Sequence, residues 1–135
     1  MRPRRRAREQ ALQALYAVTI GKRDPAEAID EIVGRAAPSE RRTFVRDLVI
    51  GTLEFTPQAD AIIGPLLEKW TIERLPSIDR CLLRMGTFEL LRTPGVPVAV
   101  VINEAVELAK NFSTEDSGRF VNGVLSAVAR SHGNA

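Results

Sequence analysis

The chain has 135 residues and is 44% apolar, which is enough for one domain with a hydrophobic core and excludes a wholly disordered protein. Its single cysteine, Cys81, excludes an internal disulfide and a cysteine-based metal site. No apolar run approaches the ~20 residues of a membrane-spanning helix, and the N-terminus lacks the apolar core of a signal peptide. We therefore expect a cytoplasmic protein with no membrane partner.

Positive charge is concentrated at the N-terminus. Of 19 basic residues, five lie among the first eight positions: Arg2, Arg4, Arg5, Arg6 and Arg8. The other 14 face 17 acidic residues, so the rest of the chain carries a net charge of −3. An acidic body with a cationic end is typical of a protein that binds nucleic acid or another acidic surface.

Apolar spacing and helix-breaking residues predict four helices in the first half of the chain. They cover residues 4–20, 25–35, 39–55 and 56–70. Gly21 stops the first helix, and Pro25 opens the second. The fourth begins at Thr56–Pro57 and places Trp70 in the core. Gly64–Pro65 lies inside it, where we expect a bend.

Three more helices are predicted in the second half, over residues 77–92, 97–112 and 114–128. In the helix predicted over residues 97–112, the apolar spacing places Val98, Leu108 and Phe112 in the core and leaves Glu104 on the polar face. Ser113 is the expected N-cap of the last helix. Gly123, within that helix, is expected to permit a close helix contact.

No segment alternates between apolar and polar residues with the period of a strand. The predicted fold class is therefore all-α, with about seven helices. We expect a single domain over residues 1–135, with an N-terminal half (1–70) and a C-terminal half (71–135) that share one core.

The sequence offers little for catalysis. The only histidine, His132, lies near the C-terminus, and there is no catalytic triad, glycine-rich phosphate loop or metal-spaced cluster. The acid pairs Glu104/Glu107 and Glu115/Asp116 are interpreted as helix-surface and helix N-terminal charges. We expect no enzyme, no cofactor and no metal.

The arginine cluster is the best candidate for function. Arg4 and Arg5 precede Arg8 by four and three residues, a spacing at which like charges on a helix repel each other. A partner with negative charge would relieve that repulsion. A solvated basic tail explains the cluster equally well, so the residues alone leave both readings open.

Two other aromatic residues have two readings each. Tyr16 is a core-edge residue by its pattern, or a ring offered to a partner. Phe120 is a core residue, or with Arg119 a platform for an RNA base. Asp116 is interpreted from its position as a helix N-terminal charge. The polar residues Asn103, Glu104 and Asn122 are placed where they could contact a partner, and hydrogen bonds between helices explain them equally well.

Three segments, which follow one another in the expected order along the chain, resemble a known family. They are RPRRRAREQALQALY, RLPSIDRCLLRMGTFELL and INEAVELAKNFSTEDSGRFVNGVL. Together they resemble the NusB family of bacterial transcription antitermination factors over nearly the whole chain. From about Gly21 to Trp70 the match is in helical pattern alone.

The resemblance implies two small helical bundles packed together in a protein without catalytic activity. It implies that the N-terminal arginines bind single-stranded boxA RNA, with Arg119 and Phe120 as a second RNA contact. It places Asp116 where the factor meets the small-subunit ribosomal protein NusE, and Tyr16 is a further candidate for a contact with a protein partner. The assembly would act on the RNA polymerase elongation complex with other Nus factors, and the free protein would be a monomer or a homodimer.

Two alternatives come from other classes. A NusB-like domain also precedes the catalytic domain of ribosomal-RNA cytosine methyltransferases, for which 135 residues leave no room unless the chain is a fragment. A helical DNA-binding module would carry its positive charge along a recognition helix rather than at a terminus.

Overall fold

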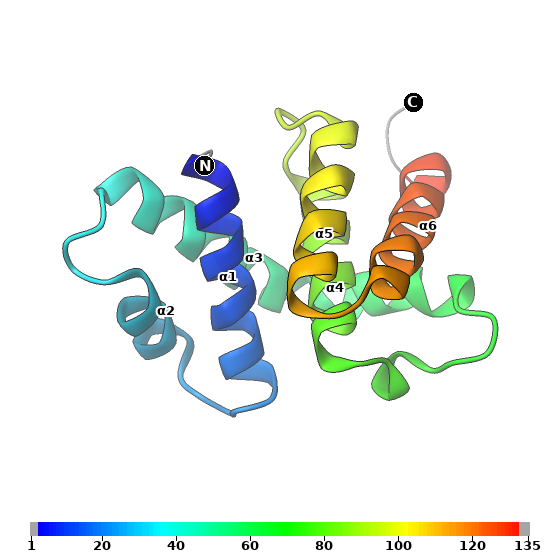
Figure 1. The fold of residues 1–135 in the computed structure, drawn as a ribbon, viewed down its shortest axis with the longest axis horizontal. Coiled ribbons are helices and arrows are strands. Elements are labelled where there is room, and N and C mark those ends of the chain that lie inside the picture. The colour runs from blue at the N-terminus through cyan, green and yellow to red at the C-terminus, as the bar shows by residue number, and fades with distance from the viewer. Residues whose placement is uncertain (1–2, 133–135) are drawn as a thin grey trace. The chain divides into compact units, whose positions relative to one another are not determined.

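The computed structural model describes residues 3–132, which form six α-helices and two short 3-10 helices and contain no strand (Figure 1). The all-α prediction is confirmed. The helices are α1 (Pro3–Thr19), α2 (Pro25–Val33), α3 (Ser39–Ile63), η1 (Gly64–Leu66), η2 (Ile72–Arg74), α4 (Ser77–Arg92), α5 (Val98–Phe112) and α6 (Glu115–His132). Within the described residues, no helix is long and apolar enough to cross a membrane.

The chain divides into two compact units between Glu54 and Phe55. In the first unit α1 and α2 pack against each other. The side-chain amide of Gln10 in α1 donates a hydrogen bond to the Ile32 carbonyl of α2, at 3.3 Å. The buried apolar side chains of this unit include Ala11, Leu12, Leu15, Ala28, Ile29, Val45 and Val49.

In the second unit α4, α5 and α6 contact one another pairwise. Gly86 of α4 permits a close approach of α6, because a Cβ atom at this position would lie 2.7 Å from Cδ1 of Leu125. The predicted close contact at Gly123 is wrong, since a Cβ there would have no atom within 4 Å.

The predicted third and fourth helices are one continuous helix, α3, which contains Pro57. The expected bend at Gly64–Pro65 is instead the end of the helix, followed by the 3-10 turn η1. The chain from Leu67 to Thr71 is not helical. Trp70 therefore has no helix to turn it inward, and it is 57% exposed rather than part of the core.

The turn between α5 and α6 also departs from the prediction. The hydroxyl of Thr114, not of Ser113, accepts the N–H of Ser117 at 3.0 Å and caps α6. Leu108 is buried as expected, whereas Phe112 is 39% exposed and Val98 is exposed as well, because both lie at the ends of α5. Glu104, placed on the polar face by its spacing, is buried.

Candidate nucleic-acid interface

The N-terminal arginines occupy different environments on α1. The side chains of Arg4 and Arg6 are about half exposed, Arg5 is partly buried, and Arg8 is only 4% exposed. Arg2 lies outside the described residues. Among the N-terminal arginines that the structure describes, Arg4 and Arg6 therefore have the side chains most exposed to a ligand.

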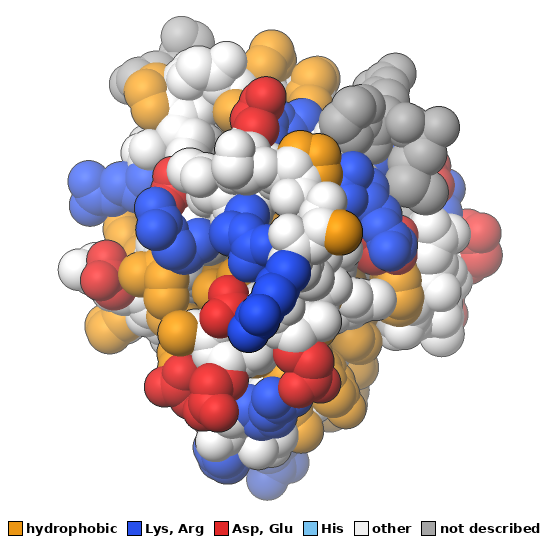
Figure 2. All heavy atoms as spheres, turned by 90° about the vertical axis from the view of Figure 1, so that its left-hand side faces the viewer, with side chains coloured by type: hydrophobic (Ala, Val, Ile, Leu, Met, Phe, Trp, Pro, Cys, Tyr) orange, Lys and Arg blue, Asp and Glu red, His pale blue; other side chains and the backbone are white. Residues whose placement is uncertain are grey.

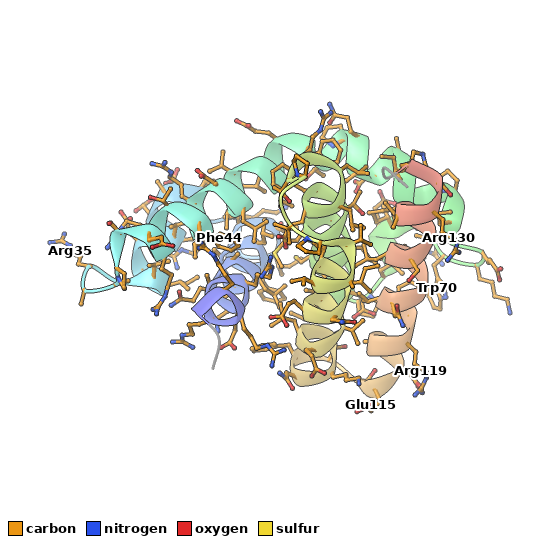
Figure 3. The ribbon with its side chains drawn as sticks, turned by 90° about the horizontal axis from the view of Figure 1, so that it is seen from above. Arg35, Phe44, Trp70, Glu115, Arg119 and Arg130 are labelled. Carbon is orange, nitrogen blue, oxygen red and sulfur yellow. The ribbon has the colours of Figure 1, made fainter. Side chains whose placement is uncertain are left out.

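Phe44, which is labelled in Figure 3, lies in α3. Two of the N-terminal arginines contact its ring, since the guanidinium carbon of Arg4 lies 4.2 Å from the ring centre and that of Arg8 lies 5.4 Å away. Both distances are within the range of a cation–π interaction. Arg4 also forms an ion pair with Glu40 at 3.3 Å, and Arg6 pairs with Glu9 at 3.1 Å.

These contacts correct one argument from the sequence. The crowding of Arg4 and Arg8 does not by itself require an anionic partner, because Phe44 and Glu40 offset the repulsion within the first unit. The side of the molecule on which α2 and the start of α3 lie carries basic side chains interspersed with acidic ones (Figure 2). A phosphate at this surface would compete with exposed ion pairs, which are individually weak.

A second basic and aromatic surface lies in the second unit. Arg119 is exposed on the first turns of α6 and forms an ion pair with Asp116, three residues before it. Phe120, partly buried, lines a groove of about 490 Å³ with Arg119. The predicted pair of Arg119 and Phe120 is thus brought together at one surface.

The sequence-based interpretation missed Trp70 at this surface. Trp70 and Lys69, from the segment after η1, line the same groove as Arg119 and Phe120 (Figure 3). The residues next to Trp70 do not indicate whether this tryptophan is exposed or is buried at the end of a helix. The signal that was present is the Gly64–Pro65 pair, which ends the helix before Trp70.

Tyr16 and Asp116, the residues predicted for the protein partner, are both exposed and lie in different units. Tyr16 is 41% exposed on α1, so its side chain is open to a partner rather than packed in the core. Asp116 lies in the first turn of α6, where a carboxylate is favoured by the helix dipole.

One buried acid lies beside the second surface. Asp79, in the first turn of α4, is 4% exposed, and its Oδ2 accepts a hydrogen bond from the hydroxyl of Ser117 at 3.1 Å. Burial raises the pKa of the Asp79 carboxyl, while the hydroxyls of Ser117 and Ser113 oppose this shift. Its Oδ1 is buried and has no hydrogen-bond partner among the described residues.

The part of the chain that the structure describes contains no group of three or more acidic, histidine or cysteine side chains able to hold a metal ion. Cys81 is buried, and no protein side chain lies in disulfide contact with it among residues 3–132. Two surfaces that combine arginine with aromatic side chains contain residues predicted from the sequence to bind RNA, one at Arg4 and Phe44 and one at Arg119 and Phe120.

Comparisons with known proteins identify relatives of the whole chain. The family model described as the NusB family matches residues 5–130. The transcription antitermination protein NusB of Geobacillus kaustophilus is 46% identical over 125 residues, covering 93% of this chain and 94% of the relative.

Solved structures agree with the sequence match. The NusB structure from T. maritima superposes with a TM-score of 0.92 and 36% identity, covering 99% of this chain and 95% of that one. A chain from a complex of the antitermination factors NusB and NusE with double-stranded RNA gives a TM-score of 0.89 at 30% identity, covering 98% and 99%. The chain belongs to the NusB family.

Proposed function

We propose that this chain is a non-enzymatic RNA-binding transcription antitermination factor that acts together with NusE. The observation that carries the proposal is the pair of half-exposed arginines, Arg4 and Arg6, at the start of α1 in a member of this family. The solved complex of related proteins contains both NusE and RNA, which supports these two classes of partner.

The RNA we propose is single-stranded boxA RNA in nascent ribosomal transcripts. Arg4 and Arg6, with Arg2 and Arg5 beside them in the sequence, supply charge for the phosphates. Arg8 is packed against Phe44, so its role is to position the end of α1 rather than to contact a phosphate directly. Phe44 limits the freedom of Arg4 before binding, which lowers the entropy cost of the contact.

Other partners follow from the proposed role. NusE is proposed to contact the surface that includes Asp116, with Tyr16 as a further contact residue. The complex would act in the cytoplasm on the RNA polymerase elongation complex with other Nus factors and promote elongation through terminators. The free protein is proposed to be a monomer or a homodimer.

The test is the salt dependence of RNA binding. Each phosphate contact on a single strand contributes ~0.7 to the slope of log K against log salt concentration. The double variant Arg4→Ala/Arg6→Ala should flatten the slope by about 1.4 and weaken binding to boxA RNA. The matched control is Arg46→Ala, because Arg46 is an exposed arginine of the same unit, outside the N-terminal cluster.

An unchanged slope in the double variant, with the helical circular-dichroism signal intact, would contradict the proposal. Equal affinity for boxA RNA and for matched duplex DNA at the same salt concentration would instead favour a general nucleic-acid binder. Formation of a complex with purified NusE, with and without boxA RNA, tests the protein partner separately.

A further inference from the structure

A third surface of the second unit lies where α4 and α6 end and α5 begins. In Figure 1 the loop between α4 and α5 and the last turns of α6 lie at the same end of this unit. A pocket of about 460 Å³ opens there, and apolar side chains of α3, α4, α5 and the loop form most of its wall. It shares no lining residue with the groove that contains Arg119 and Phe120. We call it the Val98 pocket, and the residues that matter here are Ile62, Leu90, Leu91, Arg92, Val98 and His132.

The apolar side chains of the Val98 pocket are not fully covered by the rest of the unit. Val98 is 40% exposed, although the apolar spacing along α5 predicts it to be buried. Ile62, Leu90 and Leu91 are partly exposed. A single exposed apolar side chain is ordinary in a folded protein, but a group of them in one concave surface marks a site of interaction.

The pocket carries positive charge that no neighbouring acid balances. Arg92 lines it, and its guanidinium carbon lies 5.0 Å from the centre of the Phe55 ring, a cation–π contact that keeps the side chain at the wall. Among residues 3–132, no acidic side chain lines the pocket. The exposed acidic side chains of this unit lie elsewhere, between η1 and α4 and in the first turn of α6, at the other end of α6 from His132.

Helix dipoles explain only part of this charge pattern. The C-terminal end of a helix favours a cation, which accounts for Arg92 in the last turn of α4 and His132 in the last turn of α6. The N-terminal end favours an acid, yet α5 has none in its first turn, and its N-cap, Pro97, makes no side-chain hydrogen bond. A carboxylate supplied by a partner would therefore complement both Arg92 and the start of α5.

The wall of the pocket favours a protein segment over RNA. Bases of single-stranded RNA stack on exposed aromatic rings, but the phenyl ring that lines this pocket, that of Phe55, is 7% exposed and lies under Arg92. The rest of the apolar wall is aliphatic. Aliphatic grooves of this kind receive the apolar side chains of a peptide, as in the binding of an amphipathic helix.

We propose that the Val98 pocket binds an acidic segment of a second protein in the transcription complex. An apolar side chain of that segment packs against Leu90 and Val98, and its carboxylates pair with Arg92 and lie at the N-terminal end of α5. The inference rests on the proposed function, because the partner belongs to the assembly on RNA polymerase. It adds a protein-docking site at the end of the second unit that lies away from Asp116 and Arg119.

Site-specific photocrosslinking identifies the partner. The photoreactive residue p-benzoylphenylalanine replaces Val98 in the full chain, which is assembled with boxA RNA, NusE, RNA polymerase and the other Nus factors, all purified. Irradiation should link the pocket to a protein, and mass spectrometry should place the link in a segment rich in Asp and Glu. The same probe at Asn103, exposed on α5 and outside the pocket, is the matched control and should not give this product.

A synthetic peptide with the sequence of the crosslinked segment then measures the contacts. Arg92→Glu should weaken its binding by about 10-fold or more, because like charges at an interface repel each other, whereas Arg92→Lys should retain most of the affinity. Val98→Asp removes an apolar contact and adds a negative charge, so it should weaken binding by about 10-fold or more as well. It should fold, because the first turn of a helix favours an acid.

Asn103→Asp is the matched control for Val98→Asp, since it adds the same charge to the same helix at an exposed position outside the pocket. It should leave the affinity for the peptide unchanged. Thermal melts of all variants establish that they are folded. Arg92→Glu and Val98→Asp should bind boxA RNA and NusE as wild type does, because neither residue belongs to the surfaces proposed for those partners.

The outcomes separate this inference from the proposed function. A complex that assembles with boxA RNA and NusE but gives no crosslink to a protein at Val98 would overturn the inference alone. A crosslink to RNA, to a second copy of this chain or to a segment without acidic residues would also overturn it. Failure of the wild-type chain to bind boxA RNA and NusE at all would contradict the proposed function and the inference that rests on it.

Discussion

Phe44 shows how one residue can organise a charged segment. Its ring lies beneath the guanidinium groups of Arg4 and Arg8, one half-exposed and one buried. A guanidinium group is weakly hydrated and planar, so it can lie over an aromatic face at low desolvation cost. The basic end of α1 is therefore anchored at two points, four residues apart, before any RNA is present.

Replacing Phe44 with Leu should keep most of the apolar volume but remove the ring that attracts both arginines. We expect the free energy of unfolding to fall by about 1–2 kcal/mol, since each cation–π contact contributes ~0.5–1 kcal/mol or more when it is buried. Urea unfolding measures this loss. A variant as stable as wild type would show that the two guanidinium groups rest on the ring without stabilising the fold.

The environment of Asp79 predicts how the stability of the fold depends on pH. Burial raises the pKa of this carboxyl in the folded protein above the ordinary value of 3.8. Between these two pKa values the folded state binds more protons than the unfolded state, so the contribution of Asp79 to stability increases as the pH falls through this window. At a pH above both pKa values the contribution of Asp79 to stability is at its lowest and no longer changes with pH.

We therefore expect the free energy of unfolding of Asp79→Asn, compared with that of wild type at the same pH, to be higher at pH 7 than at pH 4. The measurement is the midpoint of urea unfolding for both proteins across this range. A difference that is constant with pH would mean that the Asp79 carboxyl has the same pKa in the folded and unfolded states.

At the level of elements, α3 shows where local signals mislead. Pro57 lacks the N–H that would continue the helical hydrogen bonds, and for that reason the sequence predicts two helices here. The structure has one, because Phe55, Ala59 and Ile63 form a buried stripe at four-residue spacing on both sides of the proline. Burial of this stripe outweighs the lost hydrogen bond.

The difference between local sequence signals and tertiary packing also explains how much of the candidate site could be predicted. The helix α4, over residues 77–92, follows from a strong local pattern, and the structure confirms its bounds. Arg119 and Phe120 line one groove, and their role as an RNA contact stays a prediction from the family resemblance. Trp70 and Asp79 could not be assigned to a shared cleft, because they come from segments on either side of η2 and meet only through tertiary packing. Burial of Arg8 likewise depends on the position of Phe44, 36 residues later in the chain.

The packing of α4 on α6 makes a prediction about Gly86. A methyl group here would lie 2.7 Å and 3.0 Å from the two terminal carbons of Leu125, which is fully buried and has little room to move. Gly86→Ala should therefore destabilise the protein by about 1–3 kcal/mol, as overpacking does in cores. The control is Gly123→Ala in α6, where a methyl group meets no atom within 4 Å.

Gly123→Ala should instead raise stability by about 0.5–1 kcal/mol, because alanine has the higher helix propensity. Thermal or urea unfolding of the two variants provides the comparison. If both glycine substitutions stabilise the protein equally, the close approach of Leu125 to Gly86 does not exist in solution.

At the scale of the whole molecule, the charges on α6 link folding to assembly. Asp116 and Arg119 form an exposed ion pair, with side chains 86% and 72% exposed. Such a pair contributes less than about 1 kcal/mol to stability. It nevertheless determines how much positive charge Arg119 offers to a phosphate, because the carboxylate of Asp116 neutralises the guanidinium group at the edge of the groove.

The variant Asp116→Asn therefore separates a structural role from a role in assembly. If the carboxylate only supports the helix terminus, the variant loses less than about 1 kcal/mol of stability and binds RNA and NusE as wild type does. If Arg119 contacts RNA, removal of the competing carboxylate should tighten RNA binding and steepen the salt slope by up to ~0.7. If Asp116 instead pairs with a cation of NusE, affinity for NusE should fall by about 2 kcal/mol or more. Calorimetric titrations with boxA RNA and with NusE, beside a thermal melt, distinguish the three cases.

A double variant tests the proposed phosphate contact of Arg119. If Arg119 contacts a phosphate, adding Arg119→Ala to Asp116→Asn should abolish the gain in RNA affinity. A gain that persists in the double variant would contradict the contact.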